Sequence, residues 1–351
     1  MTDKPRRGLF ARIVSSLFKL GLLAALVAGG VGYWHFDRFT KAPIGGQATR
    51  MQIHPGESLA GAVKALRDAG VTDGNDLEWQ LLAARMGVRS KMQIGEYAVA
   101  PAMTPEQLLR DIASGKVIQY KFTIVEGWNM RELRAALKTA PNMQHLLSMT
   151  SDNALMQQLG RPHLHPEGRF LPETYAYTNG STDLDLLARA ARAMDKALGE
   201  DWDHRDPGLG LKTPDDALIL ASIVEKETAV PDERAKIAGV FTRRLQTGMK
   251  LETDPSVIYG LGGSYNGNIT RHDLIVDTPY NTYTRAGLPP TPIAMPGRAA
   301  LAAAMHPEPG DALYFVASGT GGHVFSATLA EHNAAVARYV KLQRDKKQEQ
   351  Q

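Results

Sequence analysis

Two glutamates, Glu225 and Glu227, end a predicted helix that is otherwise almost entirely apolar. Thr213 is a good N-cap residue for this helix, and between Ala217 and Val224 the only side chain that is not apolar is Ser222. A helix without a polar face is expected to be buried. A carboxyl at its end loses part of its hydration, which raises its pKa. A raised pKa suits a general acid near neutral pH, so both residues are candidates for catalysis.

The two glutamates cannot share one pocket if the helix is continuous. A step of two residues turns a helix by about 200°, so the side chains point to opposite sides. Both sides of the helix are apolar, and periodicity alone therefore does not choose between Glu225 and Glu227. The alternative is that both are exposed at a frayed helix end, with Lys226 and Arg234 as solvated partners.

Loops downstream of this helix are rich in groups that recognise sugars. Thr253-Asp254 and Tyr280–Tyr283 combine hydroxyl, carboxylate, amide and aromatic side chains. Aromatic faces can stack on the C–H faces of sugar rings, and amides and hydroxyls can bind sugar hydroxyls. Ordinary turns with half-buried tyrosines would give the same composition. We expect residues 254–296 to be irregular, and loops this long in a compact domain are usually functional.

The N-terminal segment has the pattern of a membrane anchor. Residues 1–19 carry five basic side chains and one acidic one, and the 17 residues 20–36 are apolar apart from Tyr33, Trp34 and His35. This stretch is near the short limit for a transmembrane helix, with its aromatic residues at the interface. The basic flank predicts that residues 1–19 are cytoplasmic. A cleaved signal peptide, with residues 28–30 as a poor cleavage site, is the competing interpretation.

Composition excludes several classes of function. The chain has a formal net charge of +3, and because most of this excess lies in the N-terminal tail, no nucleic-acid partner is expected. The absence of cysteine excludes disulfides, thiolate catalysis and zinc–cysteine sites. The histidines, including His163 and His165, are not clustered with carboxylates at ligand spacing, so we expect no metal and no other cofactor.

Residues 48–118 are predicted to form a small subdomain. A strand over 49–53, helices over 58–69 and 76–86 and a strand over 96–99 follow one another, and a short helix follows over 104–115. This strand–helix–helix–strand order resembles a LysM module, a fold that often binds N-acetylglucosamine polymers.

Residues 119–345 are predicted to form a larger, mixed α+β domain, which makes the fold class α+β. Helices are expected over 184–198, 214–228 and 232–247, and short strands over 313–316 and 323–326. The Lys- and Gln-rich residues beyond 342 are expected to be frayed.

Several ordered blocks of the chain closely resemble the YceG-like family of endolytic murein transglycosylases. The resemblance runs from the membrane anchor to about Tyr339. The blocks that carry it are Glu167–Tyr175, Ala221–Thr228, Thr253–Gly260, Tyr280–Tyr283, Gly287–Pro290 and Gly321–His323.

The resemblance implies a single-pass protein of the bacterial inner membrane with a periplasmic catalytic domain. Its substrate would be nascent peptidoglycan glycan strands, with peptidoglycan synthases as possible partners. The family's essential acid is the first Glu of the Ile-Val-Glu-Lys-Glu block, here Glu225. Glu225 would protonate the bond between N-acetylmuramic acid and N-acetylglucosamine. The sugar's own C6 hydroxyl would then attack C1 and leave a 1,6-anhydro end, which terminates strand elongation.

The remaining predicted site residues are assigned to substrate binding. His323 is included because it follows the glycine-rich turn at 319–322. Two other functions stay open: a muramidase that uses water with Asp254 as second carboxylate, and a glycan-binding anchor without catalysis. The predicted substrate-binding residues are Glu227, Thr253, Asp254, Tyr259, Tyr280, Asn281, Tyr283 and His323.

Overall fold

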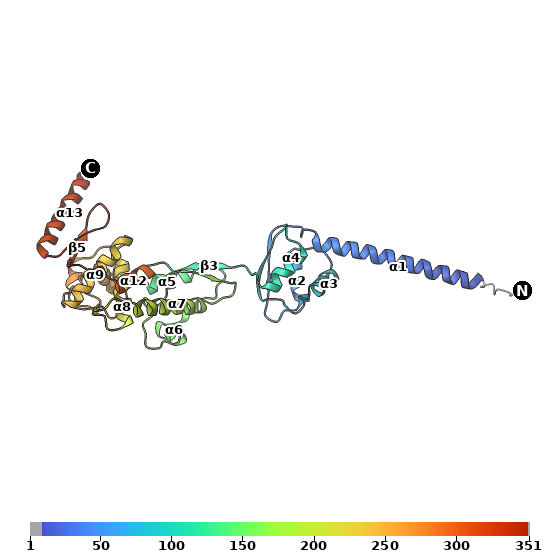
Figure 1. Ribbon diagram of the computed structural model, residues 1–351, viewed down its shortest axis with the longest axis horizontal. Coiled ribbons are helices and arrows are strands. Elements are labelled where there is room, and N and C mark those ends of the chain that lie inside the picture. The colour runs from blue at the N-terminus through green and yellow to red at the C-terminus, as the bar shows by residue number, and fades with distance from the viewer. Residues whose placement is uncertain (1–8, 350–351) are drawn as a thin grey trace. The chain divides into compact units, whose positions relative to one another are not determined.

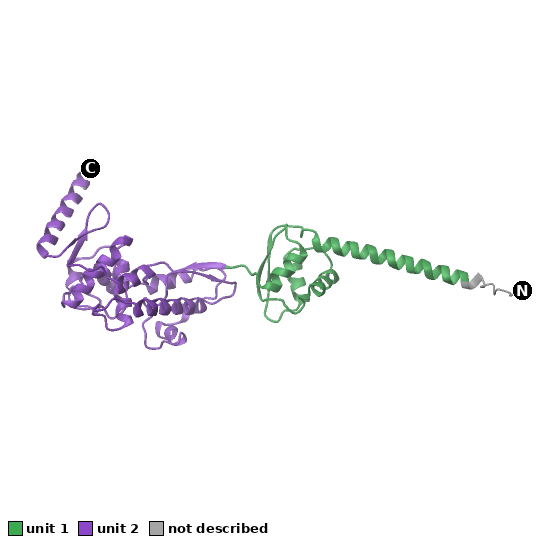
Figure 2. Ribbon diagram, in the orientation of Figure 1, with its two compact units in different colours: residues 1–119 green, residues 120–351 purple. Residues whose placement is uncertain are grey.

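The computed structural model describes residues 9–349, apart from the side chains of residues 9–11, 347 and 349. The chain divides into two compact units, Met1–Gln119 and Tyr120–Gln351 (Figure 2). The predicted cytoplasmic tail over 1–19 is described only from residue 9, so most of its basic side chains lie outside the described residues.

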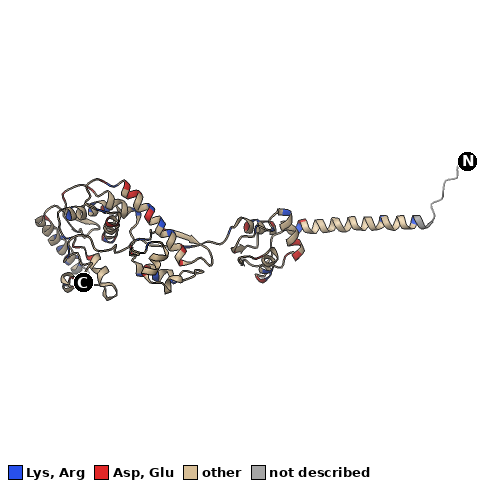
Figure 3. Ribbon diagram, turned by 90° about the horizontal axis from the view of Figure 1, so that it is seen from below, with Lys and Arg blue, Asp and Glu red and all other residues tan. Residues whose placement is uncertain are grey.

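Unit 1 begins with the long helix α1 (Leu9–Lys41). Its stretch Arg12–Lys41 is long and apolar enough to cross a membrane, and no charged residue occurs between Lys19 and Asp37 (Figure 3). The helix is longer than the predicted transmembrane segment 20–36, whose bounds followed the apolar run. Charged residues continue the helix at its end, where Lys41 pairs with Asp37 one turn earlier at 2.9 Å.

The rest of unit 1 has the predicted strand–helix–helix–strand order. A two-stranded antiparallel sheet pairs Thr49 with Val99, and the two helices between its strands are capped by Ser58 and Asn75. Trp79 is fully buried in the core between these elements. The elements are β1 (Thr49–Ile53), α2 (Leu59–Asp68), α3 (Asp76–Met86), β2 (Gly95–Val99) and α4 (Pro105–Ser114).

Unit 2 is mostly helical with two small antiparallel sheets, β3–β4 and β5–β6 (Figure 1). The coarse α+β prediction is therefore confirmed. Short 3₁₀ turns occupy 146–149, 231–233 and 262–264. The elements are β3 (Tyr120–Thr123), α5 (Met130–Leu137), α6 (Asp152–Gln158), β4 (Thr174–Tyr177), α7 (Asp183–Asp203), α8 (Pro214–Glu227), α9 (Arg234–Gln246), α10 (Asp254–Leu261), α11 (Arg271–Ile275), α12 (Arg298–Met305), β5 (Tyr314–Ala317), β6 (His323–Ser326) and α13 (Leu329–Glu349).

Two segments differ from the prediction. The stretch 254–296 contains the helices α10 and α11, so it is less irregular than expected. Residues 343–349 continue α13 instead of fraying. Lys, Gln and Arg are good helix formers, so a helix that packs on β5 and β6 through Ala335 can continue past that contact.

Helix α8 lies at the centre of the core of unit 2. Thr213 and Asp216 form a capping box at its start, and every side chain from Ala217 to Val224 is buried. Its neighbours are α7, α9, α10 and α12. The hydroxyl of Ser222 donates to the carbonyl of Ile219 at 2.7 Å and accepts from the backbone N–H of Ile293 at 3.0 Å. The one polar group in the middle of α8 is therefore satisfied.

Gly168 marks a close approach of two distant segments in unit 2. Its φ is +77°, and a Cβ at this position would lie 2.6 Å from the Cβ of Pro292. Gly160 has a similar φ of +74°, but a Cβ there would have no atom within 4 Å beyond its own chain neighbours. A Cβ at Gly160 would therefore cause backbone strain alone, whereas a Cβ at Gly168 would cause backbone strain and a collision with Pro292.

We expect Gly168→Ala to destabilise the protein more than Gly160→Ala. Each alanine must adopt a left-handed conformation, which costs roughly 1 kcal/mol. Only Gly168→Ala adds an overpacking cost of about 1–3 kcal/mol. Urea unfolding followed by circular dichroism measures the difference, and equal midpoints for the two variants would contradict the close approach.

Candidate active site

Glu225 lies at the C-terminal end of α8 and is half-buried. Its Oε2 accepts a hydrogen bond from the backbone N–H of Gly297, the residue before α12, at 2.9 Å. Burial raises the pKa of Glu225, the Gly297 hydrogen bond opposes this, and the negative charge of Glu126 raises the pKa further. The net result is a raised pKa, so the carboxyl can hold a proton at a higher pH than an exposed glutamate.

Glu126 is a second carboxylate near Glu225 that the sequence analysis did not single out. A Cβ at Gly297 would collide with the Glu126 carboxylate, so Glu126 lies against the same backbone that binds Glu225. Glu126 is exposed. It precedes the turn at Gly127, and no local pattern in the sequence indicates that this turn lies beside residue 297.

Two backbone segments, 126–130 and 292–297, are hydrogen-bonded to each other beside Glu225; we call them the paired segments. Gly127 donates to the carbonyl of Met295 at 2.9 Å, and Met295 donates to that of Trp128 at 2.7 Å. Lys226 donates from Nζ to the carbonyl of Gly127 at 3.2 Å. The last turn of α8 is therefore tied directly to the paired segments.

Glu227 projects from another side of α8, as the helix geometry predicts. The hydroxyl of Thr253 donates a short hydrogen bond to its Oε1. Burial raises the pKa of Glu227 to about 7, and the negative charge of Asp254 acts in the same direction. Glu227 lines a cavity of about 340 Å³ together with Arg244, Asp254 and Tyr283.

Thr253 and Asp254 are held on the Glu227 side of the helix. Thr253 occupies the N-cap position of α10 without a side-chain capping hydrogen bond, and its hydroxyl donates to Glu227. Asp254 accepts a hydrogen bond from the hydroxyl of Tyr283 at 2.6 Å. The muramidase interpretation paired Asp254 with Glu225, whereas this arrangement pairs Asp254 with Glu227.

Two predicted substrate-binding residues brace the loops instead of presenting free groups. The side-chain amide of Asn281 is buried and donates to the carbonyls of Asp273, Leu274 and Val276. Thr253 is also buried, with 2% of its surface exposed. The polar groups of Asn281 and Thr253 are thus used within the protein, and their predicted contact with substrate stays a prediction.

His323, on β6, is anchored by Glu233. Its Nδ1 and its backbone N–H each lie 2.7 Å from a different oxygen of the Glu233 carboxylate. Its ring packs edge-on against Phe315, which lines the Glu227 cavity. A positive charge on His323 would lower the pKa of Glu227. His323 therefore belongs to the surroundings of Glu227, not of Glu225.

Tyr259 binds a third glutamate, Glu167, and packs edge-on against Tyr280. The ring centroids of the two tyrosines are 4.9 Å apart, and the Tyr259 hydroxyl donates to Glu167 Oε2 at 3.0 Å. Both oxygens of Glu167 also lie 3.1 Å from the backbone N of Met130, in the paired segments. Glu167 is 2% exposed, and burial raises its pKa to about 7.

The three glutamates with a raised pKa differ in their access to solvent. Glu167 is enclosed, whereas Glu225 and Glu227 are only partly buried. The pKa shifts alone would favour Glu167 and Glu227 over Glu225. The kind of donor distinguishes Glu225 from Glu227, because Glu227 is held by the Thr253 side chain and Glu225 by the backbone N–H of Gly297. Within residues 12–346, no group of three or more His, Asp and Glu side chains could hold a metal ion.

Glu167→Gln is expected to change how stability depends on pH. Between about pH 4.5 and 7 the unfolded chain loses the Glu167 proton while the folded protein keeps it, which lowers the free energy of unfolding by roughly 3 kcal/mol. The substitution removes this loss, so the variant should gain stability relative to the natural protein as pH rises. Urea unfolding at several pH values measures the effect.

Glu200→Gln, at an exposed position on α7, is the matched control for Glu167→Gln. It should leave the pH dependence unchanged. A Glu167→Gln variant with the same pH dependence as this control would show that Glu167 is not desolvated.

Comparison with known proteins gives a consistent family assignment. The model of the YceG-like family matches residues 51–338. A Bacillus subtilis protein named endolytic murein transglycosylase is 30% identical over 274 residues, which cover 73% of this chain and 76% of that protein. A Streptococcus pneumoniae protein of the same name is 26% identical, and the alignment covers 92% of this chain and 64% of that protein.

A solved structure supports the same assignment. The crystal structure of a yceG-like protein from Listeria monocytogenes matches with a TM-score of 0.54 and 27% identity, over 82% of this chain and 98% of the other. The family model covers well over half of the chain, and the site residues from Glu126 to His323 lie within it. The chain therefore belongs to the YceG-like family.

Proposed function

We propose that this protein is an endolytic murein transglycosylase in which Glu225 is the general acid and base. The observation that carries the role of Glu225 is its position: a half-buried carboxyl with a raised pKa, at the end of a buried helix, held by one backbone N–H. The relatives that bear the name endolytic murein transglycosylase align over most of the chain.

The reaction follows from one carboxyl that first gives and then takes a proton. Protonated Glu225 donates its proton to the oxygen between N-acetylmuramic acid and N-acetylglucosamine, and the C1–O bond breaks. Positive charge develops at C1, and the C6 hydroxyl of the same sugar attacks it. Glu225, now a carboxylate, accepts the C6 hydroxyl proton. The products are a free N-acetylglucosamine end and a 1,6-anhydro end, and no water is consumed.

The groups around Glu227 are proposed to bind the glycan strand. The cavity of about 340 Å³ offers an aromatic ring at Tyr283, a cation at Arg244 and a carboxylate at Asp254. Such a mixture suits a sugar ring with its hydroxyl and amide substituents. Glu227 itself shapes this cavity and is fixed by Thr253. In this role it contributes to binding more than to proton transfer.

The proposed setting is the inner membrane. Helix α1 crosses it once, with the N-terminus in the cytoplasm and both the module of residues 48–118 and the catalytic domain in the periplasm. The LysM-like order of elements supports glycan binding by this module. The substrate would be nascent strands beside the synthases that make them.

Hydrolysis is the second candidate reaction, and Glu126 is the observation that favours it. A hydrolase normally uses two carboxyl groups that flank the bond, and Glu126 and Glu225 both lie against Gly297. Asp254 is the weaker choice for the second carboxylate because it lies beside Glu227. A glycan-binding anchor without catalysis is the third candidate, which turnover on purified sacculi would exclude.

Glu225→Gln is expected to lower the rate of glycan cleavage by at least ~10²-fold while the protein remains folded. Glutamine keeps the size of the side chain and can accept from Gly297, but it cannot donate the catalytic proton. Glu227→Gln is the matched variant, two residues away on the same helix, and should reduce the rate less. Release of muropeptides from sacculi measures both. If Glu227→Gln is the more damaging change, the assignment of the acid is wrong.

Digestion in ¹⁸O-labelled water distinguishes the two reactions. A transglycosylase should give an unlabelled anhydro end, about 20 Da lighter than the product of hydrolysis in this water, because one labelled water is not added. The Glu126→Gln variant should give the same product. Label at the new reducing end, lost in Glu126→Gln, would instead identify a hydrolase with Glu126 as the base.

A further inference from the structure

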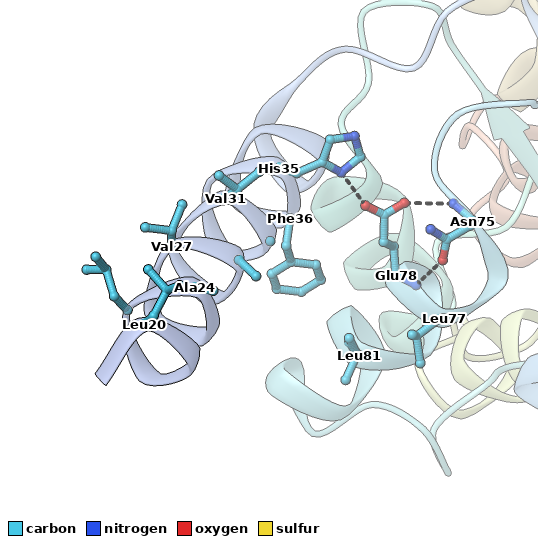
Figure 4. Close-up of a pocket in the computed structure, with 13 residues that line it drawn as sticks. Leu20, Ala24, Val27, Val31, His35, Phe36, Asn75, Leu77, Glu78 and Leu81 are labelled. Atoms are coloured by element: carbon cyan, nitrogen blue, oxygen red, sulfur yellow. Dashed lines mark hydrogen bonds and ion pairs between the residues drawn. The ribbon is translucent and has the colours of Figure 1, made fainter. Parts of the chain in front are cut away.

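Unit 1 contains an apolar groove of about 900 Å³ between α1 and α3 (Figure 4). One wall comes from α1, and the other from Leu77 and Leu81 on α3. These two leucines are 63% and 49% exposed, which is unusual for large apolar side chains on the same face of a short helix. The side chains from α1 are Leu20, Leu23, Ala24, Val27, Ala28, Val31, His35 and Phe36, with Gly32 between them.

The groove is continuous with the surface that α1 would present to a lipid bilayer. The candidate membrane span contains every α1 residue of the groove wall, and none of its most apolar window is buried in the protein. Exposing Leu77 and Leu81 to water beside such an apolar helix would be unfavourable. Lipid hydrocarbon is therefore the environment that suits both walls of the groove.

The length of α1 places Leu77 and Leu81 at the edge of the hydrocarbon. At ~1.5 Å per residue, the stretch from Leu20 to Phe36 is about 24 Å long, shorter than the ~30 Å hydrocarbon core. A short apolar stretch draws its flanking residues toward the membrane. Phe36 would then sit at or just inside the boundary, and Leu77 and Leu81 lie on the opposite wall of the same groove.

Polar groups and charged groups of both signs begin where the apolar lining ends. His35 Nδ1 lies 2.8 Å from Glu78 Oε1 at this end of the groove (Figure 4). His35 also lines a second hollow of about 310 Å³, together with Arg38 and Asp73. The Arg38 guanidinium lies 5.7 Å from the ring centroid of Trp34. A cation and an interfacial tryptophan at this level match the position of phospholipid head groups.

We propose that the groove between α1 and α3 holds an acyl chain of a phospholipid, with its phosphate beside Arg38. The module of unit 1 would then rest on the membrane through Leu77 and Leu81, instead of hanging freely from α1. This proposal rests on the membrane anchoring included in the proposed function. It would hold the glycan-binding module at the membrane surface, where new glycan strands emerge.

Spin labels test whether the groove is immersed in lipid. The chain has no cysteine, so Leu77→Cys or Leu81→Cys in the full chain gives one labelling site. Ala98→Cys, at an exposed position on β2, is the matched control. Single copies are reconstituted in nanodiscs of phosphatidylcholine and phosphatidylglycerol, where a second copy or a partner helix cannot fill the groove. Collision of the nitroxide with oxygen and with a water-soluble nickel complex is then measured.

The oxygen-to-nickel collision ratio should be several-fold higher at residues 77 and 81 than at residue 98. Equal ratios at the three positions would overturn the proposal. The unsubstituted protein provides a second measurement that needs no variant: phosphatidylcholine with a diazirine in its acyl chain should cross-link to the 77–81 segment of α3 as well as to α1. Cross-links on α1 alone would also contradict the lipid groove.

Turnover on sacculi in the same nanodiscs separates this proposal from the proposed function. Immersed labels without turnover would leave the lipid groove standing and remove the enzymatic function. Turnover with labels exposed to nickel would keep the function and remove the lipid groove.

Discussion

Helix α8 is buried on all sides by α7, α9, α10 and α12, and this burial leaves the carboxyls at its end poorly solvated. A carboxylate in such a place is costly unless it is protonated or receives hydrogen bonds. Glu225 receives one from Gly297, and Glu227 receives one from Thr253. The same constraint therefore shapes two separate environments, one on each side of the last helical turn.

The paired segments connect these environments to the rest of unit 2. Gly127 accepts from Lys226, Met130 donates to Glu167, and Gly297 donates to Glu225. Side chains from two other parts of the chain, at 167 and at 225–226, thus meet around two short stretches of backbone. Thr253, at the N-cap position of α10, turns its hydroxyl to Glu227 and makes no side-chain capping hydrogen bond.

Much of the fold could be predicted from local signals. Helix α3 has the predicted bounds 76–86, and β6 has the predicted bounds 323–326. Helix α1 extends beyond the apolar run 20–36, and α13 extends past residue 342, because the charged and Gln-rich residues there form helices well. Helix ends that lack a Gly or Pro stop signal were the hardest to predict from the sequence.

The site could be predicted only in part. The burial of α8 and the opposite directions of Glu225 and Glu227 followed from helix periodicity. The approach of Glu126 to residue 297 and of Tyr259 to Glu167 depends on contacts between distant segments, which a single sequence does not reveal. The hydrogen bonds from the Asn281 amide to the backbone of its own loop could not be predicted either.

The pH dependence of kcat tests most directly whether Glu225 is the acid. Because the protonated carboxyl is the active form, the rate should fall as pH rises through the raised pKa of Glu225. Glu126→Gln removes a negative charge beside Glu225, so it should lower this pKa and move the fall in rate to lower pH. Glu227→Gln should leave the fall in place. A profile that moves with Glu227→Gln and not with Glu126→Gln would contradict the account.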